Sequence, residues 1–242
     1  MSLAFLTPSQ TAVARSPMER EALAAGARIE QRDGWNMAVA FDGREEERLR
    51  ETVGFADFSW LAKIEVQAAA ADLAAIVAVC TSGERLELGR ATRAESAWWC
   101  PFTAERAIVL CPPSSAVELR ERLAQVASAV RGLASVVDVS TAQGALAIVG
   151  PLAREVFARF TAIDLRLQVA PVGAFRPGSL ARVPGAIVRE AGDRYLMLFG
   201  AALGRYVWTV VSDATAHLGG GPVGVDALEP IGAHTEEARV HA

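Results

Sequence analysis

The chain has 242 residues, of which 52% are hydrophobic and 21% charged, as in soluble proteins with one large domain or two small ones. Its formal net charge of −4 argues against a polyanionic partner such as nucleic acid. No apolar stretch reaches the ~18 residues that span a bilayer, and the start MSLAFLTPSQ lacks the pattern of a signal peptide, so no membrane attachment is expected.

Runs of apolar residues predict alternating helices and strands after an irregular lead-in over residues 1–14. Pro17 is expected in the first turn of the first helix, Gly54 after the second helix, and Ser114 or Ser115 as the N-cap of the fourth. The predicted helices cover residues 17–26, 44–55, 68–80, 114–130, 150–160 and 202–219. In the helix at 68–80, helical spacing predicts a buried apolar stripe of Leu73, Ile76, Val77 and Cys80. The predicted strands cover residues 62–66, 106–113, 135–140, 144–150, 181–190 and 193–200.

Two segments of the chain repeat the same order of elements. DFSWLAKIEV precedes a helix that begins near residue 70, and DVSTAQGALAIVG precedes a helix near residue 152. Several strands follow one another as hairpins, which favours antiparallel sheets. We therefore expect an α+β fold that is built from two related halves.

The repeated Asp-x-Ser triplets have a structural and a functional interpretation. Asp57 and Ser59 can bond neighbouring backbone groups where the chain enters a strand from the preceding helix, and Asp138 and Ser140 repeat the pattern. The repeat favours the structural interpretation, because two halves need two turns but not two catalytic centres.

Familiar catalytic arrangements are missing from the sequence. The three cysteines, Cys80, Cys100 and Cys111, show no metal-binding or disulfide spacing, which suits a reducing compartment and predicts a cytoplasmic protein. Cys100 lies in the apolar run AWWCPF, where burial would raise the pKa of a thiol and make it a poor nucleophile. The histidines cluster near the C-terminus, so no metal site is expected; they are His217, His234 and His241.

Tryptophans are the remaining candidates for ligand contacts. Trp35, Trp60, Trp98 and Trp99 could line a flat pocket and stack on a heteroaromatic ligand. The alternative is that they fill the core or an interface, which is the commoner use of tryptophan in a chain of this length.

The first part of the chain contains the motifs RSPMEREALAAGAR, DGWNM and VGFADFS in this order, and in these motifs it resembles the glycine-cleavage T-protein (aminomethyltransferase) superfamily. The resemblance lies in an Arg-Ser-Pro start, a Gly-Ala-Arg, a Gly-Trp-x-Met and an Asp-x-Ser before a strand. The matching residues are Arg15, Ser16, Pro17, Gly26, Ala27, Arg28, Gly34, Trp35, Met37, Gly54, Asp57 and Ser59. The second half resembles the shorter sarcosine oxidase γ-subunit of the same superfamily. This resemblance implies a folate-binding domain over residues 15–232, with related halves at about 15–130 and 131–232 and a tail at 233–242, and without the family's C-terminal barrel domain. It also implies a link to one-carbon or N-methyl amine metabolism.

The chain also departs from the family at its polar site positions. The Ile-Asp-Asp segment is replaced by AESAWWCPF, and the family's Asn falls near Cys111 and Pro112. The Tyr-Thr-Gly-Glu stretch is replaced by REAGDRY, and Gly232 stands where the last Arg is expected. Acidic and Arg side chains are the groups that would hold a pteridine and its glutamate tail.

Three functions follow from the resemblance and its departures. The first is an accessory, non-catalytic subunit that packs against flavoprotein amine-oxidase subunits. The second is a tetrahydrofolate-dependent aminomethyl- or methyltransferase, in which Trp35, Met37, Trp98 and Trp99 form the pteridine wall and Glu190 or Asp193 orients the reacting nitrogen. The third is a scaffold that binds no ligand.

Overall fold

The computed structural model describes residues 13–228, so most of the predicted lead-in and the tail at 233–242, including His234 and His241, lie outside the described residues. The described chain begins with helix α1 (Glu19–Ala24) and the hairpin of β1 (Arg28–Arg32) and β2 (Trp35–Ala40). A first helix is confirmed, but it begins at Glu19 with Met18 as N-cap, so Pro17 lies before the helix and not in its first turn. Gly26 follows the helix with a φ of 89°, a conformation that glycine adopts without strain.

Two series of elements follow, and they have the same order apart from the helix that opens the first series. The first series is α2 (Glu45–Glu51), β3 (Gly54–Asp57), β4 (Ala62–Ala68), α3 (Ala70–Cys80), β5 (Thr92–Ala94), β6 (Ala97–Thr103), β7 (Arg106–Cys111) and α4 (Pro113–Ser128). The second is β8 (Ala134–Asp138), β9 (Gln143–Val149), α5 (Ala153–Phe157), β10 (Phe175–Leu180), β11 (Val183–Ala191), β12 (Arg194–Gly200) and α6 (Gly204–Ala216). The short elements η2 (Ala201–Leu203), β13 (Gly221–Pro222) and η3 (Val225–Ala227) complete the described chain.

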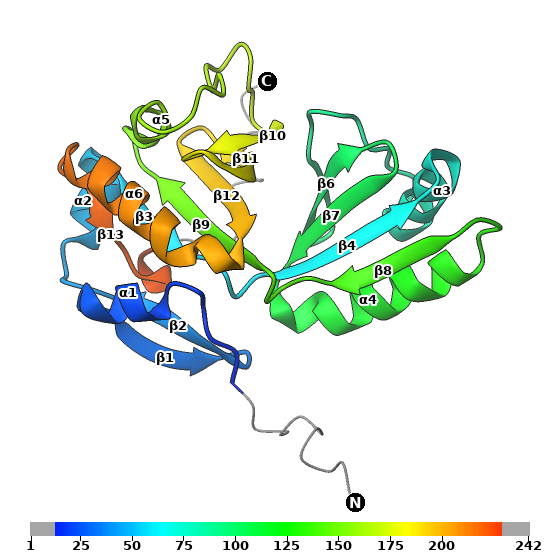
Figure 1. Cartoon of the computed structure of the whole chain (residues 1–242), viewed down its shortest axis with the longest axis horizontal. Helices are drawn as coiled ribbons and strands as arrows, with labels where there is room; N and C mark the ends of the chain where they lie inside the picture. The colour runs from blue at the N-terminus through cyan, green and yellow to red at the C-terminus, as the bar shows by residue number, and fades with distance from the viewer. Residues whose placement is uncertain (1–12, 229–242) are drawn as a thin grey trace, which may run out of the picture.

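The strands form two larger sheets, and each sheet contains one strand that comes from the other series. The six-stranded sheet has the order β10-β11-β12-β9-β3-β13 and the five-stranded sheet the order β5-β6-β7-β4-β8. Strand β3 therefore belongs to the sheet built by the second series, and β8 to the sheet built by the first. In Figure 1 the two sheets diverge from the point where β4 and β9 begin. The boundary expected near residue 130 falls between α4 and β8, but the sheets do not follow it.

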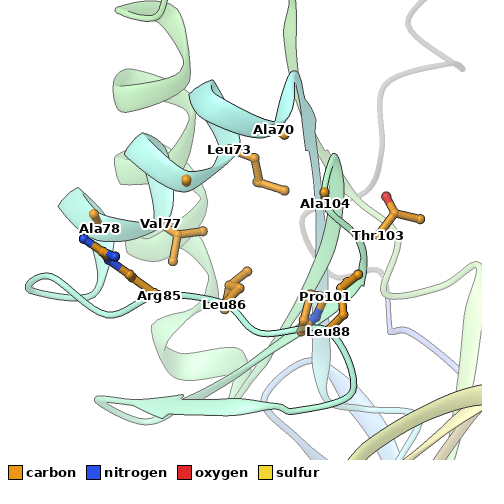
Figure 2. Close-up of a pocket in the computed structure, with 11 residues that line it drawn as sticks. Ala70, Leu73, Val77, Ala78, Arg85, Leu86, Leu88, Pro101, Thr103 and Ala104 are labelled. Carbon is orange, nitrogen blue, oxygen red and sulfur yellow. The ribbon is translucent and has the colours of Figure 1, made fainter.

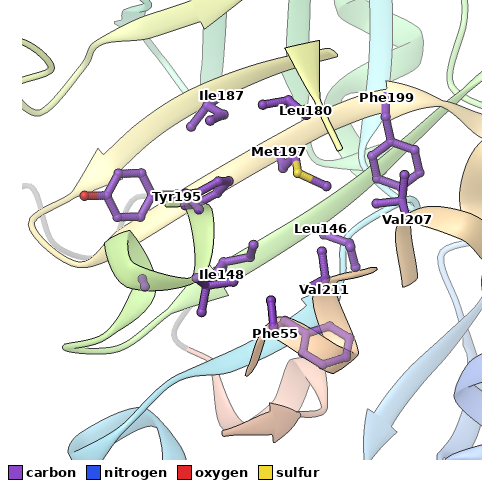
Figure 3. Packing of buried hydrophobic residues seen from close by; sticks show 14 of the residues in the cluster. Phe55, Leu146, Ile148, Leu180, Ile187, Tyr195, Met197, Phe199, Val207 and Val211 are labelled. Carbon is purple, nitrogen blue, oxygen red and sulfur yellow. The ribbon is translucent and has the colours of Figure 1, made fainter. Parts of the chain in front are cut away.

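The α+β class with antiparallel sheets is confirmed, since β13 with β3 is the one parallel pair among the sheet strands of the described residues. Helix α6 covers one face of the six-stranded sheet, where Val207 and Val211 pack on Phe55, Leu146 and neighbouring strand residues (Figure 3). Helices α3 and α4 cover the five-stranded sheet, and the predicted stripe of α3 is buried as expected: Leu73, Ile76, Val77 and Cys80.

Several predicted boundaries are wrong for local reasons. The second helix ends at Glu51, because Gly54 and Phe55 already pair with β9 as part of β3. Helix α4 begins at Pro113 with Pro112 as N-cap, so neither Ser114 nor Ser115 has that role. Helix α5 has only five residues instead of the predicted eleven-residue span 150–160.

Candidate functional site

The two Asp-x-Ser triplets form equivalent turns where the sheets meet. The backbone N–H of Ser59 donates to Asp57 Oδ1 at 2.9 Å, and the N–H of Ser140 donates to Asp138 Oδ1 at 2.9 Å. These are the turns that the structural interpretation predicted. The chain enters each of them from a strand, β3 or β8, and not from a helix as the sequence led us to expect.

The serine hydroxyls of these turns bind the opposite half of the chain. Ser59 Oγ accepts a hydrogen bond from the N–H of Ala145 at 3.2 Å, and Ser140 Oγ accepts one from the N–H of Lys63 at 2.9 Å. The residues between Asp and Ser make matching backbone bonds, since Phe58 donates to the Ala145 carbonyl and Val139 to the Lys63 carbonyl. The two crossings are therefore related by an approximate twofold symmetry.

Lys63 lies inside this crossing with no exposed surface. Its Nζ donates to the carbonyl oxygens of Ser59 and Leu61, each at 2.8 Å. Burial lowers the pKa of Lys63 to about 7, while the nearby Asp57 and Asp138 act in the opposite direction. Burial also raises the pKa of Asp57 above its usual value, opposed by hydrogen bonds from Ser16 and Ser59 and by the charge of Lys63. The sequence did not indicate this cation, because Lys63 alternates with apolar residues as a solvent-facing strand residue would.

A second polar group lies between the two sheets. The Trp98 indole N–H donates to Glu190 Oε1 at 3.0 Å, and Arg194 Nε donates to Glu190 Oε2 at 3.0 Å. The side chains of Arg194 and Glu190 are only 6% and 5% exposed, so both charges are removed from water together. The guanidinium of Arg93 lies 5.1 Å from the centre of the Trp98 ring.

An aromatic row continues from this ion pair across the molecule. Arg194 lies 5.8 Å from the centre of the Phe58 ring, and the Phe58 and Trp60 ring centres are 5.1 Å apart. Trp60 packs in turn against the cluster formed by Trp35, Met37 and Val39. We use the name aromatic row for these residues together: Trp35, Met37, Trp60, Phe58, Arg194, Glu190, Trp98 and Arg93.

Four of the six site residues expected from the sequence belong to the aromatic row: Trp35, Met37, Trp98 and Glu190. Trp99 lies on the other face of β6, buried against the α3 and α4 side, because consecutive strand residues point to opposite faces. Asp193 lies in the exposed turn between β11 and β12. The structure therefore does not bring these two side chains to the others.

Sequence reasoning missed Phe58, Arg93 and Arg194. Arg194 could have been identified from the sequence, because Glu190 and Arg194 flank a short hairpin turn and opposite charges at such positions can pair. Arg93 and Phe58 come from distant strands, and no spacing in the sequence connects them to Trp98.

A pocket of about 440 Å³ opens beside Trp98. Its charged lining includes Arg85, Arg90 and Arg93 together with Glu84 and Glu87. Cys100 lies behind the row, fully buried, and burial raises the pKa of its thiol as the sequence predicted. Within residues 13–228, no three metal-ligating side chains come together, and no helix is long and apolar enough to cross a membrane.

Few polar groups of the aromatic row are available to a flat heteroaromatic ligand such as a pteridine. The buried indole nitrogen of Trp60 has no hydrogen-bond partner among the described residues and would donate to a ring acceptor. Both oxygens of Glu190, however, already accept bonds from Trp98 and Arg194, so this carboxylate offers little to a reacting nitrogen. We assign no one-carbon transfer step to these residues.

No protein-family model matches the sequence, and a comparison with curated proteins gave no match. Solved structures do match. A chain of heterotetrameric sarcosine oxidase from Corynebacterium sp. U-96, in complex with pyrrole 2-carboxylate, has a TM-score of 0.65 at 18% identity, covering 85% of this chain and 96% of that one. Aminomethyltransferase T of the glycine cleavage system from Bartonella henselae has a TM-score of 0.71 at 17% identity, covering 89% of this chain and 60% of that one. The chain therefore has the fold of these two proteins, as the sequence resemblance predicted.

Proposed function

We propose that this chain is an accessory, non-catalytic subunit of a flavoprotein amine oxidase that acts on an N-methyl amine. The observation that carries the proposal is the extent of the structural similarity: it spans 96% of a chain from a heterotetrameric sarcosine oxidase, but 60% of the aminomethyltransferase. At this level of identity the similarity concerns the fold, so the role in an assembly rests on the surface and on the interior of the chain itself.

The interior supports a non-catalytic role. Glu190, the carboxylate of the aromatic row, is paired with Arg194 and hydrogen-bonded to Trp98, and a hydrophobic cluster lies between the sheets around it. A general base needs an oxygen that is free to accept a proton from the substrate, and both oxygens of Glu190 already accept hydrogen bonds from Trp98 and Arg194.

The surface supports association with another protein. Two loops, residues 84–91 and 164–174, lie side by side, since the N–H of Ala91 bonds to the Gly173 carbonyl and the N–H of Phe175 to the Gly89 carbonyl. They expose Leu88, Leu167, Val169 and Val172, which are 42–65% accessible. Exposed apolar side chains that gather in this way are typical of protein interfaces. We call these four residues the loop surface.

The test is purification of the full-length tagged chain from its native host. We expect a flavin-containing partner in equimolar amount, recognised by its absorption spectrum and by mass spectrometry. Val172→Asp on the loop surface should lose the partner. Leu133→Asp should keep it, because Leu133 is 96% exposed but lies in the α4–β8 connection. A chain that purifies alone and free of flavin contradicts the proposal.

The aromatic row favours a second function, which is tetrahydrofolate-dependent aminomethyl or methyl transfer. It is supported by the unpartnered indole N–H of Trp60 and by the arginines of the pocket beside Trp98, which would suit the anionic tail of a folate. Titration with 5-formyltetrahydrofolate should then quench tryptophan fluorescence, and Trp60→Phe should weaken the quenching. Absence of quenching at high micromolar ligand rejects folate binding and leaves the accessory role, or a scaffold that binds no ligand.

A further inference from the structure

A hollow of about 480 Å³ lies between helix α3, the following loop and the end of β6, on the face of the five-stranded sheet away from the aromatic row (Figure 2). Such a volume is within the range of small-molecule sites. The lining is mostly apolar and consists of Ala70, Leu73, Ala74, Val77, Ala78, Arg85, Leu86, Leu88, Pro101, Thr103 and Ala104.

The symmetry of the fold explains why the hollow exists in one half. Pro101 pairs with Ala107 and is followed by a bulge before Thr103; Arg189 pairs with Tyr195 and is followed by a bulge before Ala191. Pro101 and Arg189 therefore occupy equivalent positions, each on the helix-covered face of its sheet.

In the second half, Arg189 fills the equivalent space. Its guanidinium donates to the carbonyl oxygens of Ala170 at 2.7 Å and Gly192 at 2.6 Å, and it lies 5.3 Å from the centre of the Tyr195 ring. Leu165 from the loop after α5 is also buried there. The same fold can thus close this space with its own side chains, and the shorter Pro101 leaves it open.

Polar groups lie only at the two ends of the hollow. Arg85 lies beside Ala78 at one end, and Thr103 lies at the opposite end (Figure 2). Arg85 forms no ion pair with any residue in the described part of the chain. Thr103 Oγ1 accepts a bond from the N–H of Glu105, which leaves its hydroxyl proton available to an acceptor.

We propose that this hollow binds a small amphipathic carboxylate, with its apolar body between α3 and β6 and its carboxylate at Arg85. The apolar lining supplies the hydrophobic contact, and the guanidinium supplies a charge-assisted bond that a neutral ligand of the same length lacks. The apolar lining of this site lies on the opposite face of the sheet from the aromatic row, although Arg85 also lines the pocket beside Trp98 and Leu88 belongs to the loop surface.

The test uses calorimetric titration of the full chain with sodium octanoate and with octan-1-ol as the uncharged probe. Ala74→Leu should fill the hollow and weaken octanoate binding at least about tenfold, whereas Ala75→Leu, next to it on α3 but outside the lining, should leave binding unchanged. Arg85→Met should weaken octanoate binding about tenfold and octan-1-ol binding by less than about twofold.

The proposal is overturned if octanoate does not bind at millimolar concentration, or if Ala74→Leu and Ala75→Leu bind it equally well. Equal losses for octanoate and octan-1-ol in Arg85→Met would also overturn it, because the carboxylate would then not lie at Arg85. Circular dichroism of each variant establishes that it is folded before its titration is compared.

Discussion

Lys63 and Ser140 are joined twice: the Lys63 N–H donates to Ser140 Oγ at 2.9 Å, and Lys63 Nζ lies 3.4 Å from the Ser140 carbonyl oxygen. Strand β4 is thereby fixed to the turn between β8 and β9. Removal of the hydroxyl in Ser140→Ala leaves the Lys63 N–H without its partner, and we expect a loss of about 1–2 kcal/mol in the free energy of unfolding. Urea denaturation measures it. Ser128→Ala, which removes an exposed hydroxyl bonded to Gln125, should change stability by less than about 0.5 kcal/mol.

The charge of Lys63 should make stability depend on pH. In the unfolded chain the lysine keeps its proton up to a pKa near 10.5, whereas in the folded chain the pKa is about 7. Between these values the unfolded state binds more protons, so a rise in pH favours the folded state. From pH 7 to pH 9.5, Lys63 should add on the order of 2–3 kcal/mol to the free energy of unfolding.

Lys63→Met is the control for this pH dependence. Unfolding curves of both proteins at a series of pH values give the difference directly. The rise should disappear in Lys63→Met, and an identical rise in both proteins would assign the effect to other groups. Lys63→Met should also be less stable at high pH, because the Ser59 and Leu61 carbonyls lose their donor.

Glu190 should matter for stability through its buried partner. Glu190→Ala leaves the Arg194 guanidinium buried without its carboxylate, which should cost about 3–5 kcal/mol. Glu190→Gln keeps an acceptor for Trp98 and should cost less. Glu47→Ala breaks the exposed pair with Arg44 and should cost much less than Glu190→Ala, because water screens an exposed pair. Thermal unfolding ranks the three variants, and equal costs for Glu190→Ala and Glu47→Ala would contradict the burial argument.

Gly224 should tolerate no side chain. A Cβ at this position would lie 1.9 Å from the carbonyl oxygen of Val39, so the segment before η3 could not pack against β2. We expect Gly224→Ala to lower the free energy of unfolding by at least about 2 kcal/mol. At Gly192, a Cβ would meet no atom within 4 Å. Gly192→Ala should therefore be neutral within about 0.5 kcal/mol in the same denaturant titration.

The parts of the fold that could be predicted are those whose signals are local. The periodicity of α3 identified its buried residues, and the repeated Asp-x-Ser triplets identified the two related halves. The hairpins β1–β2 and β5–β6 were missed because β1 is polar, β5 has only three residues and Pro101 interrupts the strand pattern of β6. The exchange of β3 and β8 could not be predicted, because it depends on pairing between strands that are distant in sequence.

The candidate site was predicted less completely for the same reason. Trp98 lies on β6 and Glu190 on β11, which belong to different sheets. Their hydrogen bond forms because the two sheets face each other in the folded chain. Trp98 and Trp99 looked equivalent in the sequence, but strand geometry separates their side chains onto opposite faces. The hollow beside Arg85 is lined by residues from α3, the following loop and β6, and no sequence pattern connects these segments.

The exchange of strands also determines which strand edges remain unpaired while the chain is being synthesised. When only the first half has emerged, β4 has an open edge where β8 will pair, and β3 has no sheet to join. Both sheets close only after β8 and β9 have been synthesised, so folding depends on contacts between distant segments and is expected to be slow. During that interval the open edge of β4 is the part of the nascent chain most exposed to pairing with a neighbouring polypeptide, and the part that a chaperone would shield.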